Sequence, residues 1–376
     1  ADRAAAAKAE WTPKFEAWRA AAPEQANLFD RLVVRGLPDL QAALPVFVPG
    51  KKSTRAASGE VLTALADVVP ELWGGSADLA GSNNTTMKGQ LSFLPPEQSS
   101  HDFKGDYTGR TLHFGIREHA MGNIVNAITQ SGLTRCYGGT FLVFADYMRG
   151  AVRLAALQKV PSIFVWTHDS VGVGEDGPTH QPIEHLASLR AIPGLDVIRP
   201  ADANETAQAW AAALANADRP SAIILSRQDL LVVDRDQAGV AAASELAKGG
   251  YTLVDADGEL KVVLIATGSE VEVALAARDL LQAEGVGTRV VSMPCQEWFN
   301  AQSAEYKASV LPAGTAKVSV EAGSPMGWRE YVGDAGEIVA IDHFGESAAA
   351  GVLFAKYGFT AANVAEHART AIARLG

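Results

Sequence analysis

Residues 162–184 read SIFVWTHDSVGVGEDGPTHQPIE, and this stretch decides the fold. The run from Ser162 to Thr167 is β-branched and aromatic, which is typical of a buried parallel strand. A loop rich in glycine and proline follows at once, and open α/β sheets place ligands beyond the carboxyl ends of their strands. The sequence therefore predicts a polar site in this loop, although an ordinary surface turn is the alternative. The ionisable side chains of the loop are those of His168, Asp169, Glu175, Asp176 and His180.

Length and composition indicate two domains and a small-molecule enzyme. The chain has 376 residues, of which 48% are hydrophobic and 20% charged, and this length exceeds one typical core. A formal net charge of −11 argues against a nucleic-acid partner. Only two cysteines occur, and no apolar run has the length of a membrane span. We therefore expect a cytoplasmic protein with neither a membrane nor a nucleic-acid partner.

Residues 1–48 are expected to form an appendage rather than a domain. They begin with an alanine-rich helix on which Trp11, Phe15 and Trp18 share one face. Nothing else in the first fifty residues offers these rings a surface to cover. No methionine precedes Met87, so an initiator methionine was trimmed or the chain is the tail of something longer. The first residues favour the second interpretation, which we therefore expect.

Helical and strand patterns alternate over residues 49–232 and again over residues 250–376, with a polar connection at 231–249. Such alternation implies βαβ units and parallel sheets covered on both faces. The predicted helices are residues 56–69, 117–131, 141–157, 203–217 and 270–284. The predicted strands are residues 72–75, 162–167, 221–226, 261–267, 289–293, 317–321 and 337–341. The fold class is therefore α/β with two three-layer α/β/α domains, the first of which has a mainly parallel sheet.

The sequence also predicts two local features, a turn and a helix cap. Gly74 and Gly75 are expected to form a turn after their strand. Ser269 and Glu272 have the spacing of a capping box at the start of a helix.

Further residues outside the loop can do chemistry, but each signal is weak alone. Glu118 lies in the first turn of a predicted helix, where it could simply complement the helix dipole. Phe141, Phe144 and Tyr147 recur at i, i+3 and i+6, a spacing that is more often core than a shelf for a flat heterocycle. Arg227 follows a strand directly, so it could bind a phosphate or be a plain surface charge. No cluster has the spacing of a metal site.

Taken together, several segments of the chain resemble the transketolase family. They are residues 74–79, 115–122, 137–147, 167–184, 225–228 and 266–271. The resemblance covers almost the whole chain, and the set of segments is very specific. It implies a thiamine-diphosphate-binding fold followed by a smaller, Rossmann-like C-terminal domain. It also implies transfer of a two-carbon ketol unit from a ketose phosphate to an aldose phosphate, in the pentose phosphate pathway.

The resemblance implies how this chain would hold thiamine diphosphate. Glu118 would hydrogen-bond the aminopyrimidine ring and favour its imino tautomer. Phe141, Phe144 and Tyr147 would pack on that ring and keep its pocket dry. Asp78 would lie near the cofactor as well. The protein orients the cofactor, and the cofactor carries the difficult chemistry.

The resemblance also implies the residues that would bind the sugar phosphates. Asp176 would bind the C2 hydroxyl of the substrate, and His180 would bind the donor's hydroxyl or carbonyl while the carbon–carbon bond is cleaved. Glu118 and His180 are thus the expected catalytic residues. The expected ligands of the donor and acceptor phosphates are Arg55, Ser82, His168 and Arg227.

One departure from the family concerns the diphosphate and its magnesium ion. The N-terminal domain that holds them is missing, and no Gly-Asp-Gly followed by an asparagine metal ligand occurs. Residues 1–48 instead resemble the helical linker that follows that domain. Because the cofactor of this family lies at a dimer interface, we expect half of an active site, no metal ligands in this chain and no activity alone. The expected partner is an N-terminal half or second subunit, in a homodimer or a heterotetramer.

Other readings remain open at this point. Dihydroxyacetone synthase, deoxyxylulose-phosphate synthase and the β subunit of 2-oxoacid dehydrogenases share the architecture, although residues 174–182 fit transketolase better than the latter two. A non-catalytic binding or regulatory chain is the alternative of a different class. Against it, the polar residues expected in the site are all in place.

Overall fold

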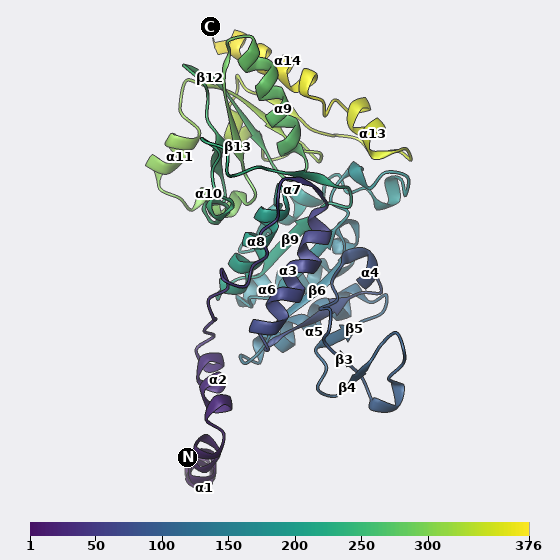
Figure 1. Cartoon of the computed structure of the whole chain (residues 1–376), viewed down its shortest axis with the longest axis vertical. Helices are drawn as coiled ribbons and strands as arrows, with labels where there is room; N and C mark the ends of the chain where they lie inside the picture. The colour runs from purple at the N-terminus through teal and green to yellow at the C-terminus, as the bar shows by residue number, and fades with distance from the viewer. Residues whose placement is uncertain (376) are drawn as a thin grey trace.

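The computed structural model describes residues 1–375 and contains a helical appendage and two α/β units (Figure 1). The appendage projects at one end, a unit with an eight-stranded sheet lies in the middle, and the unit that holds the C-terminus lies at the other end. The predicted α/β class with a larger parallel sheet and a smaller second sheet is confirmed.

Helices α1 (Asp2–Ala21) and α2 (Pro23–Val33) form the appendage. The three predicted rings of α1 do share a face, because the ring centroids of Trp11 and Phe15 lie 4.4 Å apart and those of Phe15 and Trp18 lie 5.5 Å apart. The expectation that nothing nearby covers them is wrong, since Phe29 of α2 packs edge-on against Phe15 at 5.5 Å. Trp11 nevertheless remains 52% exposed.

The larger sheet has eight parallel strands in the order β4-β3-β5-β2-β6-β7-β9-β8. They are β2 (Leu72–Ser76), β3 (Ser92–Phe93), β4 (Gly105–Asp106), β5 (Thr111–His113), β6 (Arg135–Phe141), β7 (Ile163–Thr167), β8 (Asp196–Ile198) and β9 (Ser221–Leu225). The sequence patterns missed β6, although it lies between β2 and β7 near the middle of the sheet. Gly74 and Gly75 lie inside β2, so the predicted turn at these glycines is wrong.

Helices cover both faces of this sheet. Helices α3 (Thr54–Val68) and α8 (Ala203–Ala215) pack on the face to which Tyr137, Val165 and Ile223 belong. The helices on the opposite face are α5 (Glu118–Gln130), α6 (Ala145–Gln158) and α7 (His185–Arg190). Phe164 and Trp166 face them, as the two-residue period of a strand requires.

The second sheet is mixed, with the order β11-β13-β12-β14-β15. Its strands are β11 (Tyr251–Val254), β12 (Leu260–Ala266), β13 (Gly287–Ser292), β14 (Ala316–Val320) and β15 (Glu337–Val339), and only β11 pairs in the antiparallel sense. Its helices are α9 (Glu270–Ala283), α10 (Gln296–Asn300), α11 (Ala304–Val310), α12 (Arg329–Val332), α13 (Ala350–Lys356) and α14 (Ala361–Leu375). Helices α9 and α14 share one hydrophobic core, and α10, α11 and α12 share the core on the other face. A short antiparallel pair, β1 (Gly50–Lys52) with β10 (Leu230–Val232), completes the strands of the described residues.

The predicted capping box of α9 is wrong. The hydroxyl of Ser269 donates to Glu270 Oε1 at 2.6 Å instead of capping the helix. Glu272 accepts a hydrogen bond from the Leu231 N–H at 2.6 Å. The Ser269 hydroxyl also accepts a hydrogen bond from Arg199 Nη2 at 3.3 Å. Both side chains therefore make contacts outside their own helix, which the local spacing could not reveal.

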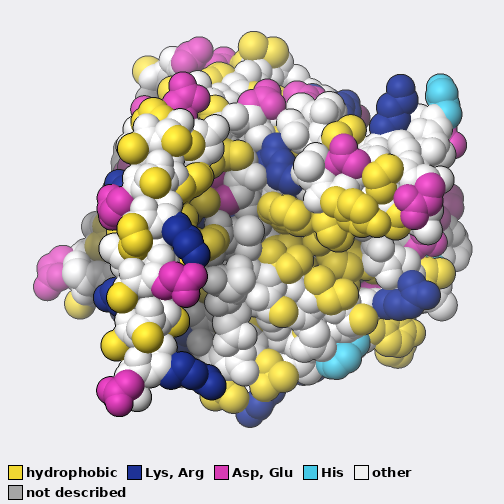
Figure 2. Space-filling view, turned by 90° about the horizontal axis from the view of Figure 1, so that it is seen from below, with side chains coloured by type: hydrophobic (Ala, Val, Ile, Leu, Met, Phe, Trp, Pro, Cys, Tyr) yellow, Lys and Arg dark blue, Asp and Glu magenta, His cyan; other side chains and the backbone are white. Residues whose placement is uncertain are grey.

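The surface seen from below carries a band of exposed hydrophobic side chains beside the appendage (Figure 2). From β3 to the first turn of α6, the exposed large hydrophobic residues are Phe93, Phe103, Tyr107, Ile116, Ile124, Leu133 and Tyr147. Over residues 1–375, no helix combines the length and the apolar character needed to cross a membrane.

Candidate active site

The loop over residues 168–184 begins at the carboxyl end of β7. Its first residue, His168, has a φ of 62°, in the left-handed region that non-glycine residues rarely adopt. The imidazole is buried, and its centroid lies 3.6 Å from that of the Phe141 ring in a stacked arrangement. Such local strain is kept where the surrounding structure determines it, and it is common at functional sites.

The predicted aromatic residues come together around the two histidines. The Phe141 and Phe144 rings stack with centroids 5.9 Å apart, and Phe144 lies 5.9 Å from Tyr147. His180 meets both phenylalanine rings edge-on, at 6.1 Å and 5.6 Å. The prediction of a single helix over residues 141–157 is wrong, because Phe141 ends β6 and a 3₁₀ turn precedes α6.

A cationic pair lies beside His168. Arg55, in the first turn of α3, donates from Nη1 to the carbonyl oxygen of Ser82 at 2.7 Å. Burial lowers the pKa of Arg55, and the charge of Arg227 lowers it further. Burial, with the charges of Arg55 and Arg227, lowers the pKa of His168 to about 3. The positive charges of two guanidinium groups therefore reach the same imidazole, and together they can neutralise a bound dianion.

In the part of the chain that the structure describes, the three predicted carboxylates make no direct contact of this kind with the cluster. Glu118 is the first residue of α5 and only 9% exposed, yet its carboxylate makes no hydrogen bond within residues 1–375. A carboxylate at the start of a helix that has no protein partner is available to a ligand. Asp78 and Asp176 are exposed, and Asp78 has a φ of 60°. No hydrogen bond or ion pair among the described residues joins these three carboxylates to the rest of the site.

Sequence reasoning missed the residues that hold His168. Thr167 and Asn83 are fully buried, and both contribute to a chain of hydrogen bonds that ends at His168 Nδ1. Thr167 ends the predicted strand and Asn83 directly follows Ser82, but hydroxyls and amides give no charge pattern that would have singled them out.

A buried ion network joins the loop to the second α/β unit. Arg199 follows β8, and its Nε donates to Asp169 Oδ2 at 3.0 Å while Nη1 pairs with Glu270. Arg190 of α7 forms a two-pronged pair with Glu321, at 2.7 Å and 2.8 Å. Burial alone would raise the pKa of Glu321, but Arg190 and Arg199 lower it to about 2. Because Asp169 adjoins His168, the C-terminal unit supports the site directly.

A second contact ties the end of the loop to the same unit. Gln181 Nε2 donates to the carbonyl oxygens of Gly174 and Glu346, both at 2.9 Å. Helix α13 also packs against the loop turn at Val171–Val173. The loop therefore lies between the two units.

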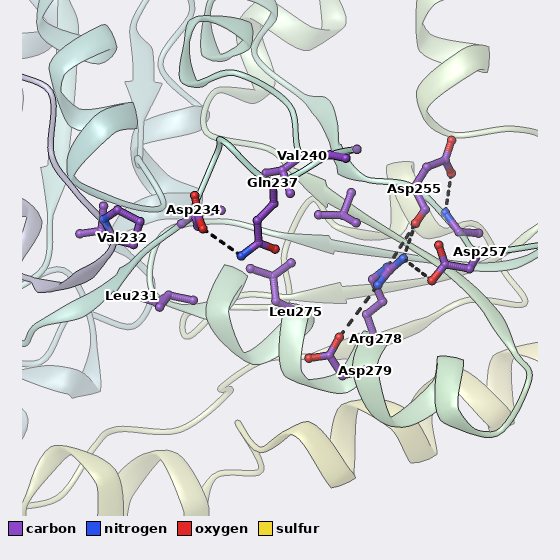
Figure 3. Close-up of a pocket in the computed structure, with 16 residues that line it drawn as sticks. Leu231, Val232, Asp234, Gln237, Val240, Asp255, Asp257, Leu275, Arg278 and Asp279 are labelled. Carbon is purple, nitrogen blue, oxygen red and sulfur yellow. Dashed lines mark hydrogen bonds and ion pairs between the residues drawn. The ribbon is translucent and has the colours of Figure 1, made fainter.

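A cleft of about 700 Å³ lies at the junction of the units, but it contains none of the predicted site residues (Figure 3). Its polar side chains bond to one another: Gln237 Nε2 donates to Asp234 Oδ2 at 3.0 Å, and Arg278 Nη2 donates to Asp257 Oδ2 at 3.1 Å. The predicted site residues therefore lie outside this cleft.

The sequence did not predict one group of possible metal ligands. Asp146, Glu184 and His185 bring their oxygen and nitrogen atoms within 4.8 Å of one another. His185 Nε2 already lies 3.2 Å from Asp146 Oδ2, so a direct contact between these two side chains also accounts for the arrangement.

Comparison with known proteins identifies the family. The model "Transketolase, pyrimidine binding domain" matches residues 50–232, and "Transketolase-like TK C-terminal domain" matches residues 249–360. The transketolase of Mycobacterium tuberculosis strain H37Rv is 57% identical over 374 residues, which cover 96% of this chain and 53% of that protein. The chain belongs to the transketolase family. The resemblance stated from the sequence is thus confirmed.

Solved transketolases have the same fold. The Pichia stipitis enzyme in complex with sedoheptulose 7-phosphate gives a TM-score of 0.90 at 42% identity, covering 97% of this chain and 53% of that one. The Leishmania mexicana transketolase gives 0.91 at 41% identity, with 100% and 53% covered. The chain therefore spans about half the length of the transketolases that it matches.

One neighbour matches over nearly its whole length. It is described as a split-gene transketolase, an inactive β4 tetramer, and the match covers 86% of this chain and 99% of that chain at a TM-score of 0.65. At 24% identity this likeness concerns the fold alone.

Proposed function

We propose that this chain supplies the pyrimidine-binding and C-terminal domains of a transketolase, over residues 49–232 and 250–376, with residues 1–48 as the linker before them. The activity is thiamine-diphosphate-dependent transfer of a two-carbon ketol unit from a ketose phosphate to an aldose phosphate, a reaction of the pentose phosphate pathway in the cytoplasm. The observation that carries the proposal is the aromatic and cationic cluster at the carboxyl ends of β6, β7 and β9.

The residues present fit the pyrimidine half of thiamine diphosphate. When bound, thiamine diphosphate supplies the carbon nucleophile and the electron sink. Glu118 is mostly buried with no protein partner, so its carboxyl group is free to share a proton with a pyrimidine ring nitrogen. Phe144 and the exposed ring of Tyr147 offer apolar faces on which a flat heterocycle can stack. Asp78 would lie near the cofactor as a further polar group.

The sugar phosphates would bind on the loop side of the cluster. Arg55 and Arg227 would neutralise a phosphate, with Ser82 and His168 as neighbours. Asp176 would accept a hydrogen bond from the C2 hydroxyl, and His180 would bind the donor's hydroxyl or carbonyl oxygen. Binding of this kind holds the reacting carbons together, which lowers the entropic part of the barrier.

The chain has no sequence pattern for the diphosphate and its Mg²⁺. We propose that the part of the relatives' length that this chain does not span supplies them, from the same or another polypeptide. The exposed hydrophobic band of Figure 2 would then be covered in a dimer or a heterotetramer. The described chain alone should show no turnover.

Complementation tests the proposal. The purified chain is mixed with thiamine diphosphate, Mg²⁺, xylulose 5-phosphate and ribose 5-phosphate, and release of glyceraldehyde 3-phosphate is followed. We expect no rate until the complementary N-terminal half of the Mycobacterium tuberculosis relative is added. Substantial turnover by the chain alone would contradict the half-site, and no turnover with any transketolase half would contradict the proposed activity.

A pair of glutamate variants tests the catalytic assignment. Glu118→Ala should abolish turnover of the complemented enzyme, because the carboxyl group is proposed to handle a proton in every cycle. Glu97→Ala is the matched control, since Glu97 is exposed and lies in a surface turn. Near-normal turnover by the Glu118 variant would show that the assigned role is wrong.

A further inference from the structure

His168 is held by a chain of buried hydrogen bonds that runs away from the ligand side of the site. His168 Nδ1 lies 2.7 Å from Thr167 Oγ1, and Thr167 Oγ1 lies 2.7 Å from Asn83 Oδ1. Asn83 Nδ2 lies 2.6 Å from Ser76 Oγ, which lies 2.7 Å from the carbonyl oxygen of Gly139. Below, the side chains of Ser76, Asn83 and Thr167 are called the relay. All three are at most 3% exposed, so water does not compete for these bonds.

The far end of the relay decides the direction of every proton in it. A backbone carbonyl has no proton to give, so the Ser76 hydroxyl must donate to Gly139. Ser76 Oγ then accepts from the amide NH₂ of Asn83, which leaves Asn83 Oδ1 as an acceptor for the Thr167 hydroxyl. Thr167 has one proton only, so its oxygen can bond His168 solely by accepting. The reversed arrangement would place two oxygens 2.7 Å apart at Gly139 with no proton between them.

We infer that the relay fixes neutral His168 in the Nδ1–H tautomer and presents an unprotonated Nε2 to the ligand. Ser76, Asn83 and Thr167 are thus positioning residues for the imidazole. The ring has no freedom to turn over, because Phe141 stacks on it with centroids 3.6 Å apart. The tautomer is assigned from the hydrogen-bond network, since protons follow from their partners.

This assignment changes what His168 can do for a ligand. Nε2 accepts a hydrogen bond from a hydroxyl group, but it can donate to a phosphate oxygen only after the ring takes up a proton. The charged or titratable groups that act on the ring are Arg55, Arg227 and His180, and Asp229 acts on Arg55. The two arginines disfavour a protonated ring until an anion offsets their charge, so a phosphate that meets Nε2 through an unprotonated oxygen must bring proton uptake with it. This consequence rests on the proposed function, whereas the tautomer does not.

Ring-nitrogen NMR of the whole chain tests the tautomer directly. The chain is labelled with ¹⁵N-histidine, and the His168 signals are identified by their loss in His168→Gln. At pH 7.5 without ligand we expect a protonated Nδ1 and a bare Nε2. Thr167→Ser keeps the accepting hydroxyl and should keep this pattern, whereas Thr167→Val should populate the Nε2–H form.

A milder variant covers the case in which Thr167→Val does not fold. Ser76→Ala removes the anchor at Gly139, so the Asn83 amide can flip and a mixture of the two tautomers should result. An Nε2–H tautomer in the unmodified chain would overturn the inference. So would an unchanged Nδ1–H signal in folded Thr167→Val or Ser76→Ala.

Inorganic phosphate added to the same sample separates this inference from the proposed function. We expect phosphate to convert His168 to the doubly protonated ring, with sodium chloride of equal ionic strength as the control. Phosphate bound beside a neutral ring that carries its proton on Nε2 would overturn the inference. Failure of phosphate to bind would count against the proposed phosphate site, while an Nδ1–H signal in that sample would still support the relay.

Discussion

Replacing Arg199 with methionine should be among the most destabilising single changes in this chain. The guanidinium is fully buried and is held by Asp169, Glu270, Thr267 and Ser269. Methionine keeps most of the volume but leaves the Asp169 and Glu270 carboxylates buried without their counter-ion. Removing one partner of a buried ion pair costs about 3–5 kcal/mol. We therefore expect the free energy of unfolding to fall by about that amount.

Urea unfolding followed by tryptophan fluorescence measures the effect. With an m-value of about 3 kcal/mol/M, a loss of about 3–5 kcal/mol lowers the midpoint by about 1–1.7 M. Arg369→Met is the matched control, because Arg369 also pairs with carboxylates but does so at the surface. Exposed ion pairs contribute little, so this variant should barely move the midpoint.

A rescue variant identifies the cause. If uncompensated charge is the reason, adding Asp169→Asn and Glu270→Gln to Arg199→Met should restore part of the lost stability. Equal midpoints for Arg199→Met and Arg369→Met would refute the reasoning, because the buried network would then contribute no more than a surface pair. Hydrogen exchange in the loop that begins at His168 should rise in Arg199→Met, since Asp169 would lose its anchor.

Three further predictions concern stability. Burial raises the pKa of Asp196 to about 6, so between pH 4 and 6 the folded state binds a proton that the unfolded state has lost. The free energy of unfolding should therefore fall by up to about 3 kcal/mol as the pH rises from 4 through 6. Asp196→Asn should flatten this pH dependence, and an unchanged pH profile in the variant would contradict the assignment to Asp196. Gly75→Ala places a methyl group against the carbonyl oxygen of Leu112 and should lower the free energy of unfolding by about 3 kcal/mol, the upper end of the usual cost of overpacking. Gly81→Ala, with open space around it, should leave the urea midpoint nearly unchanged. Tyr251→Phe removes a hydroxyl that donates to a buried carboxylate at 2.6 Å and should lower the free energy of unfolding by about 1–3 kcal/mol in the same assay.

Local patterns predicted the elements whose signal is strong within a few residues. The run before Thr167 became β7, and the alanine-rich segment from Ala203 became α8. The strand β6 was missed because Gly138 and Gly139 lower the local strand propensity. In the folded protein there is little space for side chains here, since a Cβ at Gly138 would lie 3.0 Å from Met121 and one at Gly139 would lie 2.7 Å from Thr85.

The candidate site, like the fold, was predicted from the sequence only in part. Residue types and spacing placed histidines and carboxylates on one loop at the carboxyl end of a strand. The family resemblance, not local spacing, added the aromatic rings and Glu118. Only the tertiary structure decided which of them touch. The stack of Phe141 on His168, the relay through Asn83, and the pairing of Arg199 with Glu270 join residues from 27 to 84 positions apart. The first two contacts depend on which strands become neighbours in the larger sheet, and the third depends on how the two units pack, so no local pattern of residues encodes them.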